Sequence, residues 1–304
     1  MNKKNLILGG VLAALVFFAF LYQVPYKNWQ KNHSRPDNFL SGINFANVTK
    51  IEIVKNKDVI VVEQKDDKWL IKDTKAFFVS PDIITEVKTG LEEADKAKVA
   101  LASNNSDNKS NFEVDDENGT KVKLVHGEDV LVNFMIGKAT SDFLGSYISE
   151  TGSEKTYSIA TTLNRVFVRD DWYDKEIFAI EKDAIAKVRF QYDDTGFTIE
   201  KEDDKWIGLV PYRFRVSEEK VEEILNIMSA LSATEIPAQT FEGTGLEKNS
   251  IIVQVIGEGV DNTLMIGDDN GEELYYAKKG TNDNIYLITK EQRDELDKTY
   301  RDLR

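Results

Sequence analysis

The sequence predicts an α+β fold: an N-terminal transmembrane helix followed by two tandem, duplicated domains of antiparallel strands, each packed on one main helix. Three observations predict this fold. There is an uncharged apolar run near the N-terminus, a set of landmarks recurs at nearly constant spacing, and short strand-like segments surround one amphipathic helix in each copy. The 304 residues are enough for about two domains of ordinary size.

The apolar run extends from Leu6 to Tyr22 without a charged residue. A helix needs about 20 residues to cross the hydrocarbon core, and the run reaches that length when its neighbours are included. Residues 20–23 do not form the small-x-small site at which a signal peptide is cleaved. We therefore expect a retained single-pass signal anchor over residues 6–24, after a cytoplasmic tail of residues 1–5 and before a tether of residues 25–40. The short tail favours an extracytoplasmic body.

An internal repeat fills the rest of the chain. The sequence of residues 66–71, Asp-Asp-Lys-Trp-Leu-Ile, recurs as Asp-Asp-Lys-Trp-Ile-Gly at residues 203–208, and Met-Ile-Gly at 135–137 recurs at 265–267. Copy one thus spans residues 41–180 and copy two residues 181–304. The second copy is shorter, and we expect the extra residues of the first to lie in a solvated loop at residues 103–110.

Each copy begins with strand patterns, continues with a helix and ends with more strands. Serine followed by proline or glutamate predicts helix starts after Ser80 and Ser217. Expected strands are residues 50–54, 59–64, 69–71, 121–126, 130–136, 146–149 and 156–159 in copy one, and 251–256, 262–266, 274–277 and 285–288 in copy two. Closing helices are expected at residues 162–177 and 290–304.

Apolar residues at helical spacing predict the buried face of each main helix. These are Ile84, Val87, Leu91 and Ala94 in copy one, and Val221, Ile224, Leu225, Met228 and Leu231 in copy two. A ligand groove lined by Met228 is the alternative to a core role.

The composition excludes several kinds of chemistry. A net charge of −14 argues against a nucleic-acid partner, because phosphate recognition begins from a basic patch. The chain has no cysteine and only two histidines, so thiolate chemistry is absent and the commonest metal ligand is scarce. We expect no cofactor, no metal site and no catalytic residue.

The acidic clusters predict turns. Residues 268–273 lack the ligand spacing of a calcium loop, and so do residues 115–119. The pairs Asp66-Asp67 and Asp203-Asp204 precede a tryptophan in both copies, which is typical of a turn rather than of paired catalytic acids.

Candidate partner contacts lie at two places. Trp172 and Tyr173, with the nearby Arg169, form a candidate contact patch between the copies; the alternative is that they pack the two domains together. Arg213 and Arg215 alternate with aromatic residues before the second main helix, and they project either toward a partner or into solvent.

The chain resembles a family of bacterial proteins known only as domain of unknown function number 4340. The resemblance covers nearly all of the chain after the anchor and is carried by Trp69, Trp206, Gly245-Leu246, residues 264–267, Tyr275-Tyr276, residues 285–287 and the charged segment 169–175. Copy one departs from the pattern with Phe112-Glu113-Val114 where copy two has Thr244-Gly245-Leu246. The resemblance implies a protein tethered to the bacterial inner membrane, with its body outside the cytoplasm, sometimes associated with ABC-transporter or gliding-motility gene sets.

Three functions remain open from the sequence. The first is a non-enzymatic accessory or scaffold subunit of a membrane or envelope protein complex, in which the anchor raises local concentration. The second is a binding protein for an envelope glycan, peptide or lipid, held in the cleft between the copies. The third is an unrecognised hydrolase whose carboxylates come from distant positions.

Overall fold

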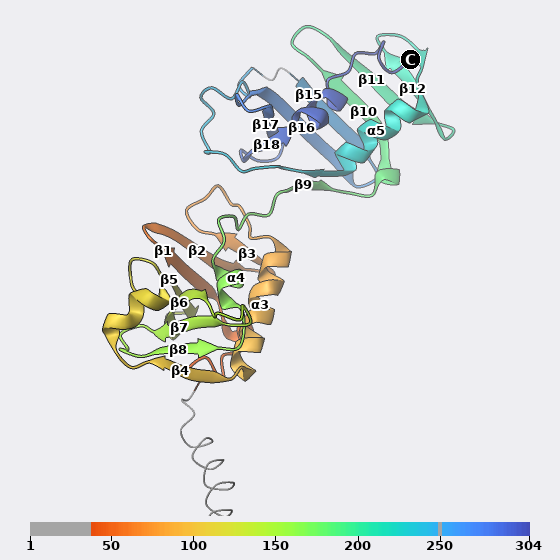
Figure 1. Cartoon of the computed structure of the whole chain (residues 1–304). Coiled ribbons are helices and arrows are strands. Elements are labelled where there is room, and N and C mark those ends of the chain that lie inside the picture. The colour runs from red at the N-terminus through yellow and green to blue at the C-terminus, as the bar shows by residue number, and fades with distance from the viewer. Residues whose placement is uncertain (1–37, 249–250) are drawn as a thin grey trace, which may run out of the picture. The chain divides into compact units, whose positions relative to one another are not determined.

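The computed structural model describes residues 38–248 and 251–304 (Figure 1). The predicted anchor at residues 6–24 and most of the predicted tether lie outside the described residues. Among residues 38–248 and 251–304, no helix has both the length and the apolar character needed to cross a membrane.

The first sheet has eight strands in the order β3-β2-β1-β5-β6-β7-β8-β4. Helix α3 (Pro81–Lys96) is its main helix, and short helices are α4 (Leu163–Phe167) and the 3₁₀ segments η2 (Phe45–Asn47) and η3 (Ser106–Phe112). The strands are β1 (Lys50–Lys55), β2 (Asp58–Lys65), β3 (Lys68–Ile71), β4 (Val99–Ser103), β5 (Thr120–His126), β6 (Asp129–Ala139), β7 (Ser146–Glu150) and β8 (Thr156–Ile159).

The second sheet also has eight strands, in the order β13-β12-β11-β10-β15-β16-β17-β18. Its helices are α5 (Glu218–Ser229), α6 (Lys290–Leu296) and η4 (Lys182–Ala184), and β9 (Glu176–Ala179) pairs separately with β14 (Ala230–Ser232). The sheet strands are β10 (Ile185–Gln191), β11 (Gly196–Glu202), β12 (Lys205–Val210), β13 (Phe214–Arg215), β15 (Ile251–Gly257), β16 (Val260–Asp269), β17 (Leu274–Lys279) and β18 (Ile285–Thr289).

Strand register confirms the duplication. Lys50 pairs with Glu63 in the first sheet, and Lys187 pairs with Glu200 in the second, 137 residues further along both strands. The bridge between Leu70 and Phe78 likewise matches the pair of Ile207 and Arg215. In both copies the meander and the later strands join one sheet, because β1 pairs with β5 and β10 pairs with β15. Both copies are β-rich, with largely antiparallel sheets and few helices.

The main helices bury the predicted apolar faces. Val87, Leu91 and Ala94 of α3 are buried, whereas Ile84 is half-buried. Val221, Ile224, Leu225 and Met228 of α5 are all buried, and Leu231 is buried in β14 rather than in the helix. Each fully buried side chain of this size stabilises the fold by roughly 1.5–3 kcal/mol relative to an exposed one. Ser217 precedes α5, but its side chain makes no capping hydrogen bond.

The predicted closing helices were too long. Helix α4 ends at Phe167, and the Asp171 and Asp174 carboxylates then accept the backbone N–H groups of Tyr173 and Glu176. Such local side-chain bonds compete with helical ones, so the chain turns and continues as β9. Helix α6 similarly ends at Leu296. The predicted loop at residues 103–110 also contains the helical segment η3.

By compactness, the chain divides into two units that do not follow the copy boundaries. The first unit contains the described residues up to Gln64 and Asp82–Asp170. The second contains Lys65–Pro81 and Asp171–Arg304. We refer to them as the first and second units.

Candidate functional site

A hollow of about 780 Å³ in the second unit lies between the β10–β11 hairpin and the chain that follows α6. Its apolar wall comes from aromatic and proline side chains, and its polar groups come from aspartate, threonine and arginine. The lining residues are Tyr192, Asp194, Thr195, Gly196, Phe197, Pro211, Asp297, Thr299, Tyr300 and Arg301. This combination of an apolar wall and a few polar groups is typical of a binding site.

The hairpin side of the hollow is held by three contacts. The Tyr192 N–H donates to the Thr195 carbonyl at 2.8 Å and closes the turn. The Phe190 and Phe197 rings stack with centroids 4.3 Å apart and planes 9° apart. The Tyr192 hydroxyl donates to the Lys298 carbonyl, which joins the hairpin to the C-terminal segment. Burial of Tyr192, together with the charge of Asp297, raises the pKa of this phenol, so it stays neutral.

The C-terminal segment is held by its own turn and by α5. The Asp302 carboxylate accepts the backbone N–H and the hydroxyl of Thr299 at 2.8 and 2.7 Å. The hydroxyl bond is the main cause of the lowered pKa of Asp302. Leu303 is fully buried, and its carbonyl accepts the N–H of Ser217 just before α5. Figure 1 accordingly shows the C-terminus beside α5 and β12.

An aromatic cluster with one arginine borders the hollow. The rings of Tyr212, Phe214 and Tyr300 meet edge to face, with centroids 5.7–6.1 Å apart. The Arg304 guanidinium lies 5.6–5.9 Å from all three ring centroids. Val210 and Tyr212 remain 48% and 46% exposed. We call Val210, Tyr212, Tyr300 and Arg304, together with the buried Phe214 ring that Tyr212 and Tyr300 contact, the C-terminal aromatic surface.

The strand before α5 projects the predicted arginines outward. Phe214 is buried, whereas Arg213 and Arg215 on either side of it are exposed. Arg213 makes two contacts to the Glu202 carboxylate, at 3.1 and 2.7 Å, which lower the pKa of Glu202. Both arginines are neighbours in sequence of Tyr212 and Phe214. Arg213 is already paired with Glu202.

The other predicted contact patch does not form an exposed surface. The Trp172 side chain is 1% exposed, so it belongs to the core, and its carbonyl accepts the Ser80 N–H at 3.1 Å. Tyr173 is half-buried and packs edge to face on Phe77 at 5.3 Å. In the first unit, Arg169 pairs with Glu86 at 2.5 Å and donates to the Val166 carbonyl. Trp172 is thus a core residue of the second unit, and the two predicted roles of this segment, partner contact and packing of the two domains, stay predictions.

The predicted acidic turns are confirmed as turns. Asp66, Asp203 and Asp204 have positive φ, which aspartate tolerates better than most residues. In the turn before β17, Asn270 accepts the N–H groups of Glu272 and Leu274. In the part of the chain that the structure describes, no group of three His, Cys, Asp or Glu side chains is placed to hold a metal ion.

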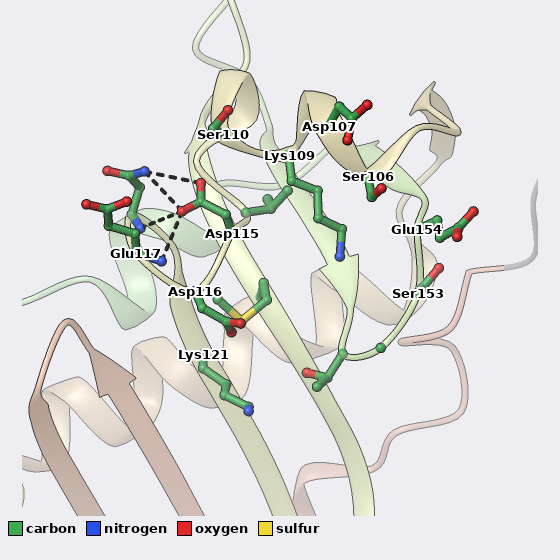
Figure 2. A pocket seen from close by; sticks show the side chains of 15 residues that line it. Ser106, Asp107, Lys109, Ser110, Asp115, Asp116, Glu117, Lys121, Ser153 and Glu154 are labelled. Carbon is green, nitrogen blue, oxygen red and sulfur yellow. Dashed lines mark hydrogen bonds between the residues drawn. The ribbon is translucent and has the colours of Figure 1, made fainter.

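A second hollow, of about 580 Å³, lies in the first unit beside η3 (Figure 2). Figure 2 shows the Lys109 side chain reaching into it and Asp115 at its edge. The Asp115 carboxylate accepts the N–H groups of Glu117 and Asn118 at 2.9 and 3.0 Å, and also the Asn118 side-chain amide. Burial raises the pKa of Asp115, but these hydrogen bonds outweigh burial and lower it. This carboxylate therefore stabilises a turn and has little capacity left for a ligand.

The C-terminal aromatic surface was not predicted as a site. The sequence predicts one helix over residues 290–304, in which Tyr300 and Arg304 would share a face without meeting Tyr212. Aromatic and arginine residues cluster around both Tyr212 and Tyr300 in the sequence, and this pattern could have indicated a contact site. Nothing in the sequence shows that the two segments meet.

Fold and site together define a class: a tandem duplication of one β-rich repeat that carries an exposed aromatic and arginine surface on its second unit. The chain belongs to the family described as Domain of unknown function (DUF4340), whose profile matches residues 69–243 and again residues 210–304. Two overlapping matches agree with a duplicated domain. No curated protein and no solved structure gives a significant match to the chain.

Proposed function

We propose that the protein is a non-enzymatic accessory or scaffold subunit of a bacterial envelope or membrane complex. Its predicted anchor would hold it at the inner membrane with both units outside the cytoplasm. Its second unit binds a partner protein through the C-terminal aromatic surface. The observation that carries this proposal is the cluster of Tyr212, Tyr300 and Arg304 beside an open hollow.

The chemistry of this surface suits a protein partner. Tyrosine and arginine are enriched among the side chains that contribute most binding energy at interfaces. The Arg304 guanidinium already lies near three rings, so we expect little conformational entropy to be lost when a partner covers it. The hollow beside it offers space for a partner side chain. Transporter subunits are the first partners to consider, given the gene sets implied by the family resemblance.

Co-purification from detergent-solubilised membranes tests the proposal. The double variant Tyr212→Ala/Arg304→Ala should reduce partner recovery by at least about 10-fold, since each interfacial anchor contributes roughly 1–3 kcal/mol. The control Val130→Ala/Leu131→Ala removes exposed apolar area from the first unit and should leave recovery unchanged. A chain that purifies alone at native abundance, with or without the substitutions, contradicts the proposal.

A second candidate function is favoured by the polar lining of the hollow. Asp194, Asp297 and Thr299 line the hollow together with aromatic and proline side chains, a combination that suits a sugar ring with one apolar face and several hydroxyls. Titration with chitotetraose, followed by NMR, would show shifts at Thr195 and Thr299 if the hollow binds glycans. These shifts should disappear in Tyr300→Ala.

The hydrolase hypothesis is tested at the same place. Asp194 and Asp297 both line the hollow, so the variant Asp194→Asn/Asp297→Asn should abolish any hydrolysis of an envelope glycan while binding persists. Hydrolysis by the unmodified chain that this variant lacks would overturn the non-enzymatic proposal.

A further inference from the structure

The turn between β6 and β7 displays two adjacent apolar side chains to solvent. Phe143 and Leu144 are 78% and 72% exposed, more than any other large apolar side chain among the described residues. Single exposed apolar residues are ordinary on protein surfaces. Here the two apolar side chains are adjacent at the tip of a hairpin and form one exposed apolar patch. Contiguous apolar patches on a surface mark interaction sites.

The turn is well ordered. The Thr140 N–H donates to the Gly145 carbonyl, and the Phe143 N–H donates to the Thr140 carbonyl, both at 2.9 Å. The Asp142 carboxylate accepts the Thr140 hydroxyl at 2.6 Å and the Leu144 N–H at 3.1 Å. Phe143 has a φ of 59°, which a bulky residue rarely adopts. The two apolar side chains are thus held outward by a specific backbone conformation.

The second copy shows that the fold does not require apolar residues here. The matching turn, between β16 and β17, carries Glu272 and Glu273, and both are exposed. Glu273 also has positive φ, at 62°, so the backbone device is shared. At the position with positive φ, one copy presents an exposed phenylalanine and the other an exposed carboxylate.

Hydrogen bonds link the strand that follows the apolar tip to the place where the described chain begins. The Asn38 side chain donates to the Ala94 carbonyl at the end of α3, at 2.6 Å. The Thr161 hydroxyl donates to Glu93 of the same helix end at 3.0 Å. The Ser146 hydroxyl, at the start of β7, donates to the Thr161 carbonyl at 3.1 Å. This series of contacts connects Asn38 to Ser146, two residues after the tip.

The chain before Asn38 is too short to carry this end far from the bilayer. Only residues 25–37 separate the predicted anchor from Asn38. Thirteen residues span at most about 45 Å when fully extended, and less in any relaxed conformation. The tip of the first unit is therefore within reach of the membrane surface.

A basic hollow lies beside the tip. It has a volume of about 450 Å³ and is lined by Lys55, Lys138 and Arg165, with Glu113 as the one carboxylate among its lining residues. Elsewhere the chain is acidic, with 53 aspartates and glutamates against 39 lysines and arginines. Three cations around one hollow complement the phosphate groups of anionic lipids.

We propose that the β6–β7 tip inserts Phe143 and Leu144 into the surface of the bilayer, while Lys55, Lys138 and Arg165 contact anionic headgroups. This inference rests on the anchor of the proposed function. It adds a second attachment point, which fixes the orientation of the first unit at the membrane. Two weak attachments on one chain bind more firmly than either alone.

The absence of cysteine makes a direct test simple, because one introduced thiol carries the only label. The full chain is reconstituted into phosphatidylcholine vesicles with or without phosphatidylglycerol, carrying a nitroxide at Phe143→Cys or, as the matched control, at Glu273→Cys. Power-saturation spectroscopy then compares access of oxygen, which enriches in lipid, with access of a water-soluble nickel complex. The ratio at position 143 should be about fivefold higher than at position 273, and higher still with phosphatidylglycerol.

The charge contribution is tested by Lys138→Glu in the Phe143→Cys chain. In this variant, phosphatidylglycerol should no longer increase the ratio of oxygen access to nickel access at position 143, because a cation of the basic hollow has become an anion. Equal ratios at positions 143 and 273 in a membrane-retained chain would overturn the inference and leave the anchor intact. A chain released from vesicles by alkaline carbonate would overturn both. A label that is aqueous in lipid vesicles but shielded in native membranes would assign the tip to a protein partner and overturn lipid insertion.

Discussion

The two copies pair their first strands in the same register, yet the turns that follow β6 and β16 carry opposite chemistry. Phe143 and Leu144 are exposed in one turn, and Glu272 and Glu273 in the other. The two copies share a backbone conformation because close contacts, such as those at Gly137 and Gly267, leave no room for another one. The exposed side chains of the turns make no such contacts, so they can differ between the copies. Duplication has therefore kept one scaffold and given its two copies different surfaces.

The largest expected effect tests whether the two main helices are equivalent. Leu91 of α3 and Met228 of α5 occupy matching positions and are 1% and 0% exposed. Leu91→Ala and Met228→Ala should each lower the free energy of unfolding by about 2–5 kcal/mol, since each leaves a cavity in a packed core. Hydrogen exchange should locate each loss in the unit that carries the substitution. A loss of protection spread equally over both units would show that they do not unfold separately.

The next effect concerns a glycine shared by both copies. A Cβ at Gly137 would lie 2.0 Å from the Phe112 carbonyl oxygen, and one at Gly267 would lie 2.1 Å from the Thr244 carbonyl oxygen. Gly137→Ala and Gly267→Ala should each cost about 1–3 kcal/mol in chemical denaturation, because backbone must move. The exposed neighbour Lys138→Ala should cost less than about 0.5 kcal/mol. Unequal costs for the two glycines would contradict a shared backbone.

A smaller effect should have opposite signs in the two copies. Glu113 has a φ of 57° where copy two has Gly245 at 69°. Glu113→Gly should stabilise the first unit by about 0.5–1 kcal/mol, because glycine adopts this conformation without strain. Gly245→Ala should destabilise the second by about 1–2 kcal/mol, since its Cβ would lie 2.5 Å from the Asp268 carboxyl carbon. Thermal melts of both variants test this prediction: the melting temperature should rise for Glu113→Gly and fall for Gly245→Ala.

The smallest effect depends on pH. Glu52 in β1 lies 3.1 Å from both Lys50 and Lys123, whereas the matching residue of copy two is Arg189. Burial raises the pKa of Glu52, but the hydrogen bonds from the two lysines outweigh burial and hold its pKa below 4.5. A lowered pKa gives stability that is present above pH 4.5 and is lost as the pH falls through the folded value.

The variant Glu52→Gln should therefore remove a small pH-dependent contribution from the first unit. We expect about 0.5 kcal/mol or less, because the pair is partly exposed to solvent. Denaturation midpoints measured at about pH 3 and about pH 6, on either side of the ordinary carboxyl pKa, give the size of this contribution. A larger loss at pH 6 than at pH 3 agrees with the account, and the reverse order contradicts it.

Much of the fold could be predicted from the sequence. Period-two apolar patterns located the strands, and the recurrence of Trp69 as Trp206 fixed the register of the duplication. The ends of both copies were predicted poorly, because side-chain bonds from Asp171, Asp174 and Asp302 turn the chain where helical spacing alone would continue. Hydrogen bonds from side chains to nearby backbone groups compete with helical hydrogen bonds, and they produce no periodic pattern that could be recognised in the sequence.

The candidate site could be predicted only in part. Arg213 and Arg215 do project from their strand, as the alternation suggested. The sequence left two roles open for Trp172, a partner contact and a packing role, because burial is decided by what packs against a side chain and the sequence does not show this. The C-terminal aromatic surface requires Tyr212 and Tyr300 to meet across 88 residues of chain, which only the folded structure supplies.

The most direct test of the central claim is photo-crosslinking in intact cells. A photoreactive amino acid replaces Tyr212 in one chain and Val130, an exposed residue of the first unit, in another. The account predicts a discrete crosslinked adduct to one partner protein from position 212 and none from position 130. No adduct from position 212, or the same adducts from both positions, would contradict a partner-binding role for the C-terminal aromatic surface.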